Sequence, residues 1–364
     1  MPQVLSANTP IKYSLKLVEL LYNETIYTKI TNTDYEGEIR NEGDRVRVRT
    51  LGKLTLSDYT KGMTLVAQEL APISEDMIVD QQKYFKFEVD DIDKLQNDID
   101  TINKYAQTSK RDMAQVIDTD ILTYMRKNVS GNNVIGTAYA TGTVAVAATT
   151  GVVTGTGTTF TAAMVGGYFK PSTLSGYYLV TSFASTTSIT VTDLSGVSYT
   201  GGAVAGGTSY TINGATAVAV TKSTIYGHLV DLGVALDEAL TPAEGRFIVI
   251  NGKFRGALLK APEFIPAVGQ AYDNVVLGGR IGEIAGFNVY VSQLVNGDNT
   301  TGYWYVAGTK DFCAMALQIM KVSTVSSEMD PNSFKTTVKG LLVWGRKVFE
   351  GNRGRGAVIR ATIS

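Results

Sequence analysis

The sequence predicts an α+β protein with more than one folding unit and an inserted all-β segment. The chain has 364 residues, and a single hydrophobic core rarely grows beyond about 250–300 residues. Its hydrophobic content of 44% is enough for a sizeable core. Helical and strand patterns alternate without the regular strand–helix–strand repeat of a parallel sheet. One long stretch between them has almost no charge.

Residues 1–43 predict a mixed N-terminal segment. Apolar side chains recur at helical spacing and indicate a short amphipathic helix: Ile11, Leu15, Val18, Leu21 and Tyr22. The chain start lacks the basic and apolar regions of a signal peptide. No run of about 18 apolar residues occurs. We therefore expect neither secretion nor a membrane partner.

Residues 44–89 predict a long two-stranded hairpin. Its outgoing strand alternates arginine with valine, which gives one basic and one apolar face: Arg45, Val46, Arg47, Val48 and Arg49. The return run over 77–89 alternates as well. Since an isolated hairpin is at best marginal in water, we expect it to need a neighbouring surface. Lys53 and Lys61 lie near the expected tip.

Residues 90–127 carry the clearest helical pattern, with apolar side chains three and four positions apart. Such a helix would be roughly 55 Å long. Asp90, Asp91 and Asp93 crowd its expected start, where carboxylates favour the positive end of the helix dipole. A calcium site there is a less favoured reading. The basic strand could contact nucleic acid, but we favour its pairing with these carboxylates on a neighbouring copy.

The composition changes abruptly after the helix. Between residues 128 and 221 only Lys170 and Asp193 are charged. Short β-branched runs over 143–146, 177–181 and 188–192 are separated by glycine-rich turns. Aromatic residues supply enough bulk for a small core, so we favour an inserted all-β domain over 135–212, with disorder as the alternative.

Helical periodicity returns over 222–240 and ends at Pro242. The remaining expected elements are a buried strand at 246–250, a helix near 254–260, strands near 287–291 and 303–307, a helix over 310–320, and strands over 337–349 and 357–363.

A search for reactive groups finds little. The single cysteine, Cys313, cannot form a disulfide within the chain, and with the single histidine, His228, it cannot complete a His/Cys zinc site. No phosphate-binding glycine motif of the Walker type is present. A net charge of −1 excludes a strongly basic nucleic-acid clamp. We therefore expect no enzyme activity, cofactor or metal.

Four segments, taken in order, resemble the major capsid proteins of tailed bacteriophages with the Hong Kong ninety-seven fold. They are 43–48 (GDRVRV), 236–250 (LDEALTPAEGRFIVI), 279–292 (GRIGEIAGFNVYVS) and 339–348 (KGLLVWGRKV). The resemblance implies an arm over 1–43, an extended loop over 44–89, a peripheral domain with a spine helix over 90–134, the insert over 135–212, an axial domain over 213–325 and a peripheral return over 326–364.

The resemblance also implies a function. The chain would self-assemble as pentamers and hexamers into an icosahedral shell around double-stranded phage DNA, without sequence-specific binding. Scaffold and portal proteins would be partners, with assembly in the host cytoplasm and a final place in the virion. Candidate contacts between copies are Arg45, Arg47, Arg49, Lys53, Lys61, Asp90, Asp91 and Asp93. The alternatives are an encapsulin-type nanocompartment and a surface adhesin acting through the insert.

Overall fold

A computed structural model describes residues 25–35, 45–50, 56, 58–64, 73–90, 101–262, 282–325 and 335–363. The chain forms two compact units, in agreement with its length. The first contains residues 1–19, 33–107 and 314–349, and the second contains 20–32, 108–313 and 350–364. The helix expected over 11–22 lies outside the described residues.

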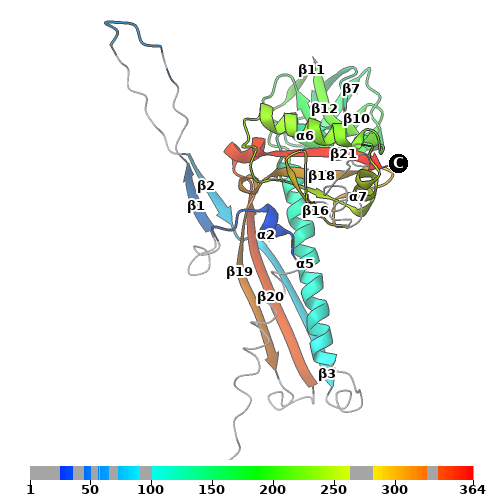
Figure 1. The fold of residues 1–364 in the computed structure, drawn as a ribbon. Helices are drawn as coiled ribbons and strands as arrows, with labels where there is room; N and C mark the ends of the chain where they lie inside the picture. The colour runs from blue at the N-terminus through cyan, green and yellow to red at the C-terminus, as the bar shows by residue number, and fades with distance from the viewer. Residues whose placement is uncertain are drawn as a thin grey trace, which may run out of the picture. The chain divides into compact units, whose positions relative to one another are not determined.

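The first unit contains a hairpin and a three-stranded antiparallel sheet (Figure 1). The hairpin pairs β1 (Arg45–Thr50) with β2 (Ile73–Ile78). The sheet has the order β19 (Ala314–Val325), β20 (Lys335–Lys347) and β3 (Gln81–Asp90). The return run expected over 77–89 is thus divided between the hairpin and the sheet.

Strand β3 leaves the hairpin because β20 offers it a matching partner. Ten consecutive residues of β3 pair in register with β20. The ring of Phe85 lies over Gly340, where a Cβ atom would come within 2.1 Å of a ring carbon. A side chain at position 340 would overlap the Phe85 ring. Glycine at this position therefore allows β3 to pair with β20.

The helix expected over 310–320 is wrong. A short 3-10 turn (Lys310–Phe312) is followed by β19, which pairs with β20 from Ala314↔Lys347 to Val325↔Thr337. The segment is rich in alanine, leucine and methionine, which favour helices by only a fraction of a kcal/mol per residue. A long neighbouring strand outweighs that preference.

The long helix α5 (Thr101–Asn128) carries Arg126 and Lys127 in its last turn, as expected. Its start differs from the expectation, because Asp90 ends strand β3 and does not begin the helix. Asp91 and Asp93 lie outside the described residues. The division between the two units falls within α5, after Gln107.

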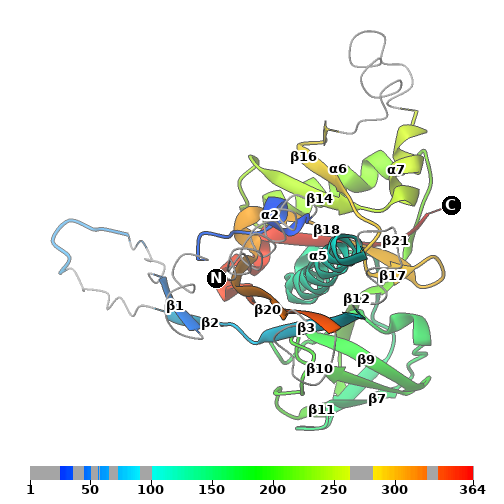
Figure 2. The ribbon, with the colours of Figure 1, turned by 90° about the horizontal axis from the view of Figure 1, so that it is seen from below.

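The body of the second unit is a mixed sheet (Figure 2). Its strands run in the order β13 (Val218–Val220), β21 (Gly356–Ile363), β18 (Gly302–Thr309), β14 (Arg246–Ile250), β16 (Phe287–Val291) and β15 (Glu283–Ile284), with β17 (Gly297–Asp298) beside β18 and β4 (Val134–Ile135) beside β21. Every residue of β14 is buried, as the sequence predicts. Helices α6 (Ile225–Glu238) and α7 (Gly252–Leu259) also lie near their expected positions.

A buried arginine joins α6 to β14. Arg246 Nη2 lies 2.6 Å from Asp237 Oδ1 near the end of the helix and also donates to the carbonyl oxygen of Thr241. Its Nε donates to the carbonyl of Pro242. One guanidinium therefore holds the turn between the two elements in a fixed conformation.

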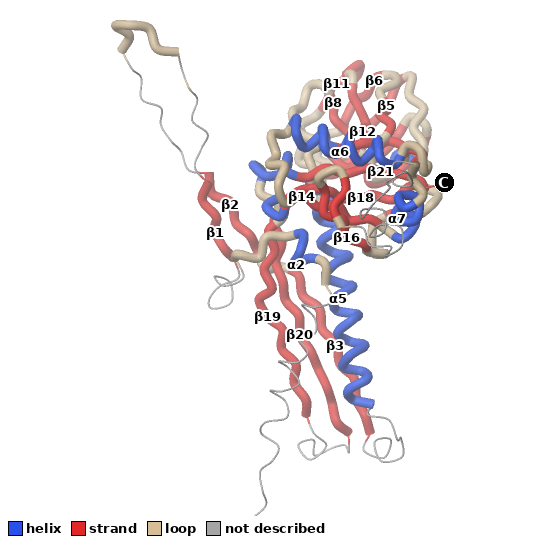
Figure 3. The backbone as a smooth tube through the Cα atoms, in the orientation of Figure 1, coloured by secondary structure: helices blue, strands red, loops and turns tan. Residues whose placement is uncertain are grey.

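Residues 137–216 form a second sheet in this unit (Figure 3). Its order is β11 (Val204–Thr208), β6 (Thr143–Val146), β7 (Val152–Thr156), β10 (Ser188–Thr192), β9 (Tyr178–Ser185), β8 (Tyr168–Pro171), β12 (Tyr210–Thr216) and β5 (Thr137–Tyr139). This sheet corresponds to the all-β segment predicted over 135–212, and from here on the insert means residues 137–216. It has its own core, in which Phe160, Phe169 and Ile212 are almost fully buried.

The short helix α2 (Tyr27–Ile30) is capped by a side chain from α5. The Asp118 carboxylate accepts hydrogen bonds from the backbone N–H groups of Ile26 and Tyr27 at 3.1–3.2 Å. Burial raises the pKa of Asp118 to about 6, although these two N–H groups favour the charged form. The segment around α2 is thus attached to α5 by backbone hydrogen bonds to a buried carboxyl group.

Replacing Asp118 by asparagine should remove a pH dependence of stability. The unfolded carboxyl ionises near pH 4, whereas the folded one holds its proton until about pH 6. The wild-type free energy of unfolding should therefore fall by about 3 kcal/mol relative to Asp118→Asn as the pH rises through this window. Urea unfolding of the unassembled chain between pH 4 and 7 measures the difference. Asp112→Asn, an exposed change on the same helix, should keep the wild-type slope; equal slopes for all three proteins would contradict the assignment.

Candidate assembly surfaces

The apolar face of the hairpin base is covered by its own unit. Val46 and Met77 are buried against a cluster that includes Ala316 of β19, Val343 of β20 and Phe349. Val48 and Tyr35 pack against the same cluster. The expectation that this face needs a neighbouring molecule is therefore wrong for the base, because the adjoining sheet supplies the apolar surface.

The basic face of β1 also finds a partner within the hairpin. Arg47 donates from Nε and Nη2 to the two carboxylate oxygens of Asp76, at 2.7 and 3.1 Å. Arg45 Nη1 lies 3.8 Å from the same carboxylate. The Arg47 guanidinium holds the pKa of Asp76 below its usual range. The sequence reasoning missed Asp76 as a partner within the chain, and a contact of these arginines with a neighbouring copy stays a prediction.

The other candidate contacts are not brought together. Arg49 is exposed and stands opposite Ser74 in the hairpin register. Asp90 stands opposite Lys335 at the end of the three-stranded sheet. Lys61 is exposed, whereas Lys53, Asp91 and Asp93 lie outside the described residues. The described candidates are therefore distributed over separate places on the first unit.

The hairpin tip carries exposed apolar side chains that the sequence reasoning also missed. We define the tip as the described residues 56 and 58–64. Leu56 is 97% exposed, Tyr59 68% and Met63 50%. Gly62, with φ +90°, follows Lys61 in a turn in which the Met63 N–H donates to the Thr60 carbonyl. The available signal was the presence of three large apolar residues among the otherwise polar residues of 56–64.

Two arginines and a tryptophan join the insert to the body of the second unit. The guanidinium carbons of Arg126 and Arg360 lie 4.2 and 5.0 Å from the centroid of the Trp304 ring. The Tyr168 ring meets Trp304 edge-on at 6.0 Å. Since Trp304 belongs to β18 and Tyr168 to the insert, this contact connects two sheets.

Hydrogen bonds to carbonyl oxygens complete the joint. Arg360 donates to the carbonyls of Gly214 and Ala215 in the insert, and Arg126 donates to Gly166. Burial lowers the pKa of Arg360 to about 10. Stacking on an aromatic ring and bonding to carbonyls suit a guanidinium that is partly removed from water. The insert is therefore held by oriented polar contacts as well as by apolar packing.

The surroundings of the single histidine and the single cysteine indicate structural roles for both. His228 Nδ1 lies 3.4 Å from an Asp231 carboxylate oxygen on the same helix. Cys313 is fully buried, and burial raises the pKa of its thiol to about 12. Within the described ranges, no cluster of three His, Cys, Asp or Glu side chains could hold a metal ion. None of the described helices combines the length and apolarity needed to cross a bilayer.

Comparisons with known proteins agree with this architecture. The family described as phage capsid protein matches residues 183–359. The fold is similar to structures of Mycobacterium phage Che8 (TM-score 0.61, 17% identity, 92% of this chain and 91% of that chain), of the cyanophage P-SCSP1u capsid (0.58, 13%, 93% and 89%) and of the bacteriophage PhiM1 mature capsid (0.53, 11%, 91% and 87%). No curated protein matches the sequence.

The chain therefore shares its fold with proteins in these phage and phage capsid structures. The phage capsid family model covers just under half of the chain, and the solved structures, at 17% identity or less, show that the fold is shared. They do not favour the nanocompartment or adhesin alternatives.

Trp304 should be a major contributor to the stability of the second unit. It is 4% exposed and contacts both arginines and Tyr168. Trp304→Ala should lower the free energy of unfolding by about 3–5 kcal/mol, because it leaves a cavity and removes the ring from the two guanidinium groups. Trp304→Phe keeps a ring and should cost clearly less. Chemical denaturation of the unassembled chain measures both, and a loss below about 1 kcal/mol for Trp304→Ala would contradict the role of the joint.

Proposed function

We propose that this chain forms a closed icosahedral shell around packaged double-stranded DNA, with the hairpin tip contacting a neighbouring copy. The observation that supports this is the contrast between the two ends of the hairpin. The base is anchored by Val46 and Met77 in its own unit, whereas Leu56, Tyr59 and Met63 at the tip are exposed. An anchored stem with an apolar tip suits a contact between molecules.

Burial of the tip at such a contact would favour assembly. Full burial of a large apolar side chain contributes about 1.5–3 kcal/mol. Three such side chains at every interface would add up to a stable shell, since each copy both gives and receives a contact. Head-to-tail contacts that close into rings of five and six copies would produce a finite container.

The remaining features fit the same proposal. Residues 1–43 would act as an arm, 44–89 as the extended loop, 90–134 and 326–364 as the peripheral domain, and 213–325 as the axial domain. Scaffold and portal proteins would guide assembly in the host cytoplasm. A net charge of −1 suits a container whose DNA enters and leaves without strong adhesion to the wall.

The combined change Leu56→Ser, Tyr59→Ser and Met63→Ser should block shell formation without unfolding the chain. The three side chains are exposed, so their loss should leave the melting temperature of the unassembled chain within about 2 °C of wild type. With scaffold supplied, negative-stain electron microscopy and sedimentation should show shells for wild type and only small species for the variant.

The matched control is Val197→Ser, an apolar residue of the insert that is 80% exposed. It should assemble as wild type does. Normal shell yield from the triple variant would contradict a role for the tip in assembly.

A further inference from the structure

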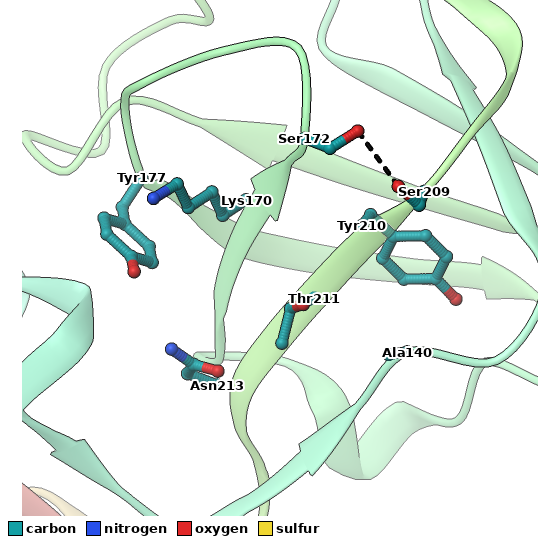
Figure 4. A pocket seen from close by; sticks show the side chains of 8 residues that line it. All are labelled: Ala140, Lys170, Ser172, Tyr177, Ser209, Tyr210, Thr211 and Asn213. Carbon is teal, nitrogen blue, oxygen red and sulfur yellow. Dashed lines mark hydrogen bonds between the residues drawn. The ribbon is translucent and has the colours of Figure 1, made fainter.

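The insert contains an open pocket of about 630 Å³ (Figure 4). Its lining combines hydroxyl, amide and aromatic groups with a single charged side chain: Ala140, Lys170, Ser172, Tyr177, Ser209, Tyr210, Thr211 and Asn213. We call it the insert pocket. Its volume lies within the range of small-molecule sites.

The pairing of β8 with β12 builds the floor of the pocket. Lys170 stands directly opposite Thr211 in this antiparallel pair, so both side chains point to the same face. The neighbouring residues Phe169 and Ile212 point to the other face, into the insert core. Ser209 donates a hydrogen bond to Ser172 at 3.0 Å, which Figure 4 shows at one end of the floor. The core therefore fixes which polar groups face the pocket.

The Lys170 ammonium is positioned by an aromatic ring and has no carboxylate partner among the described residues. Its Nζ lies 4.9 Å from the centroid of the Tyr177 ring. Tyr177 is itself held, because its hydroxyl donates to Asn132 and its ring covers Gly131, where a Cβ would come within 2.2 Å. No carboxylate lines the pocket, and the described residues form no ion pair with Lys170.

The charge of Lys170 is unusual for this part of the sequence. Lys170 is the only cation between residues 128 and 221, and the one anion of that stretch, Asp193, hydrogen-bonds to Thr200. An uncompensated ammonium in a concave site attracts an anion. One cation is too few for a nucleic-acid backbone, whose binding depends on several phosphate contacts.

The other lining groups suit a polyhydroxylated ligand. Ser172, Ser209 and Thr211 each supply a hydroxyl that can donate and accept. The Asn213 amide nitrogen donates to the Gly131 carbonyl at 2.8 Å, which orients its side-chain oxygen as an acceptor. A sugar ring presents hydroxyl groups of the same kind, and an acidic sugar adds the anion.

We propose that the insert pocket binds an acidic saccharide, with Lys170 pairing with its carboxylate or phosphate and Thr211 and Asn213 contacting its hydroxyl groups. Cell-surface polysaccharides are the natural source of such units. The proposal goes beyond the role in shell assembly and does not depend on it, since the pocket lies within one chain.

The test measures binding to the unassembled full-length chain by isothermal titration calorimetry. The probes are trigalacturonic acid, galactotriose and phosphorylated galactotriose. At least one acidic probe should bind more tightly than the neutral one, and the affinity should fall with added salt. The two acidic probes distinguish a carboxylate ligand from a phosphate ligand.

Variants assign the binding to the pocket. Lys170→Gln should lower the affinity for the acidic probe by about tenfold or more, because a charge-assisted hydrogen bond is lost. Thr211→Val should lower this affinity severalfold. Lys222→Gln, a change at an exposed lysine outside the pocket, should leave the affinity unchanged. Thermal melting confirms that each variant is folded. The proposal is overturned if neither acidic probe binds, if galactotriose binds equally well, or if Lys170→Gln binds as wild type does.

Discussion

The apolar cluster at the hairpin base is the interaction on which the rest of the first unit depends. It joins Val46 and Met77 of the hairpin to Ala316 and Val343 of two strands that lie more than 230 residues later in the chain. Without it, the hairpin would be an isolated two-stranded ribbon, which is marginal in water. With it, the exposed apolar tip is carried on an anchored base. A buried base and an exposed apolar tip are the features on which the proposed contact between copies rests.

Charged groups have mainly local roles in the described structure. Arg47 pairs with Asp76 across the hairpin, Arg246 with Asp237 at a helix end, and Arg126 and Arg360 stack on Trp304. Exposed pairs of the first kind contribute little to stability. The buried arginines matter more, because each satisfies carbonyl oxygens that would otherwise lose their hydrogen bonds on leaving water. The insert differs, since Lys170 is held in place without a carboxylate.

Helices and strands whose hydrophobic pattern is set by their own residues could be predicted from the sequence. The α6 stripe of Leu229, Leu232 and Leu236 and the buried strand β14 follow from spacing and hydrophobicity alone. The alternation of arginine and valine in β1 likewise predicted its two faces correctly. The strand β19 was mistaken for a helix, because its local preference is helical and only the presence of β20 reverses it.

The sequence by itself determined the α+β class, the charge-poor β segment, the two faces of β1 and the resemblance from which the proposed function starts. The tertiary structure decided which surfaces are left for partners. It placed Asp76 opposite Arg47, covered the hairpin base with β19 and β20, and left Leu56, Tyr59 and Met63 exposed. These outcomes depend on pairings between residues far apart in the chain, and a linear pattern does not contain the distances that decide such pairings.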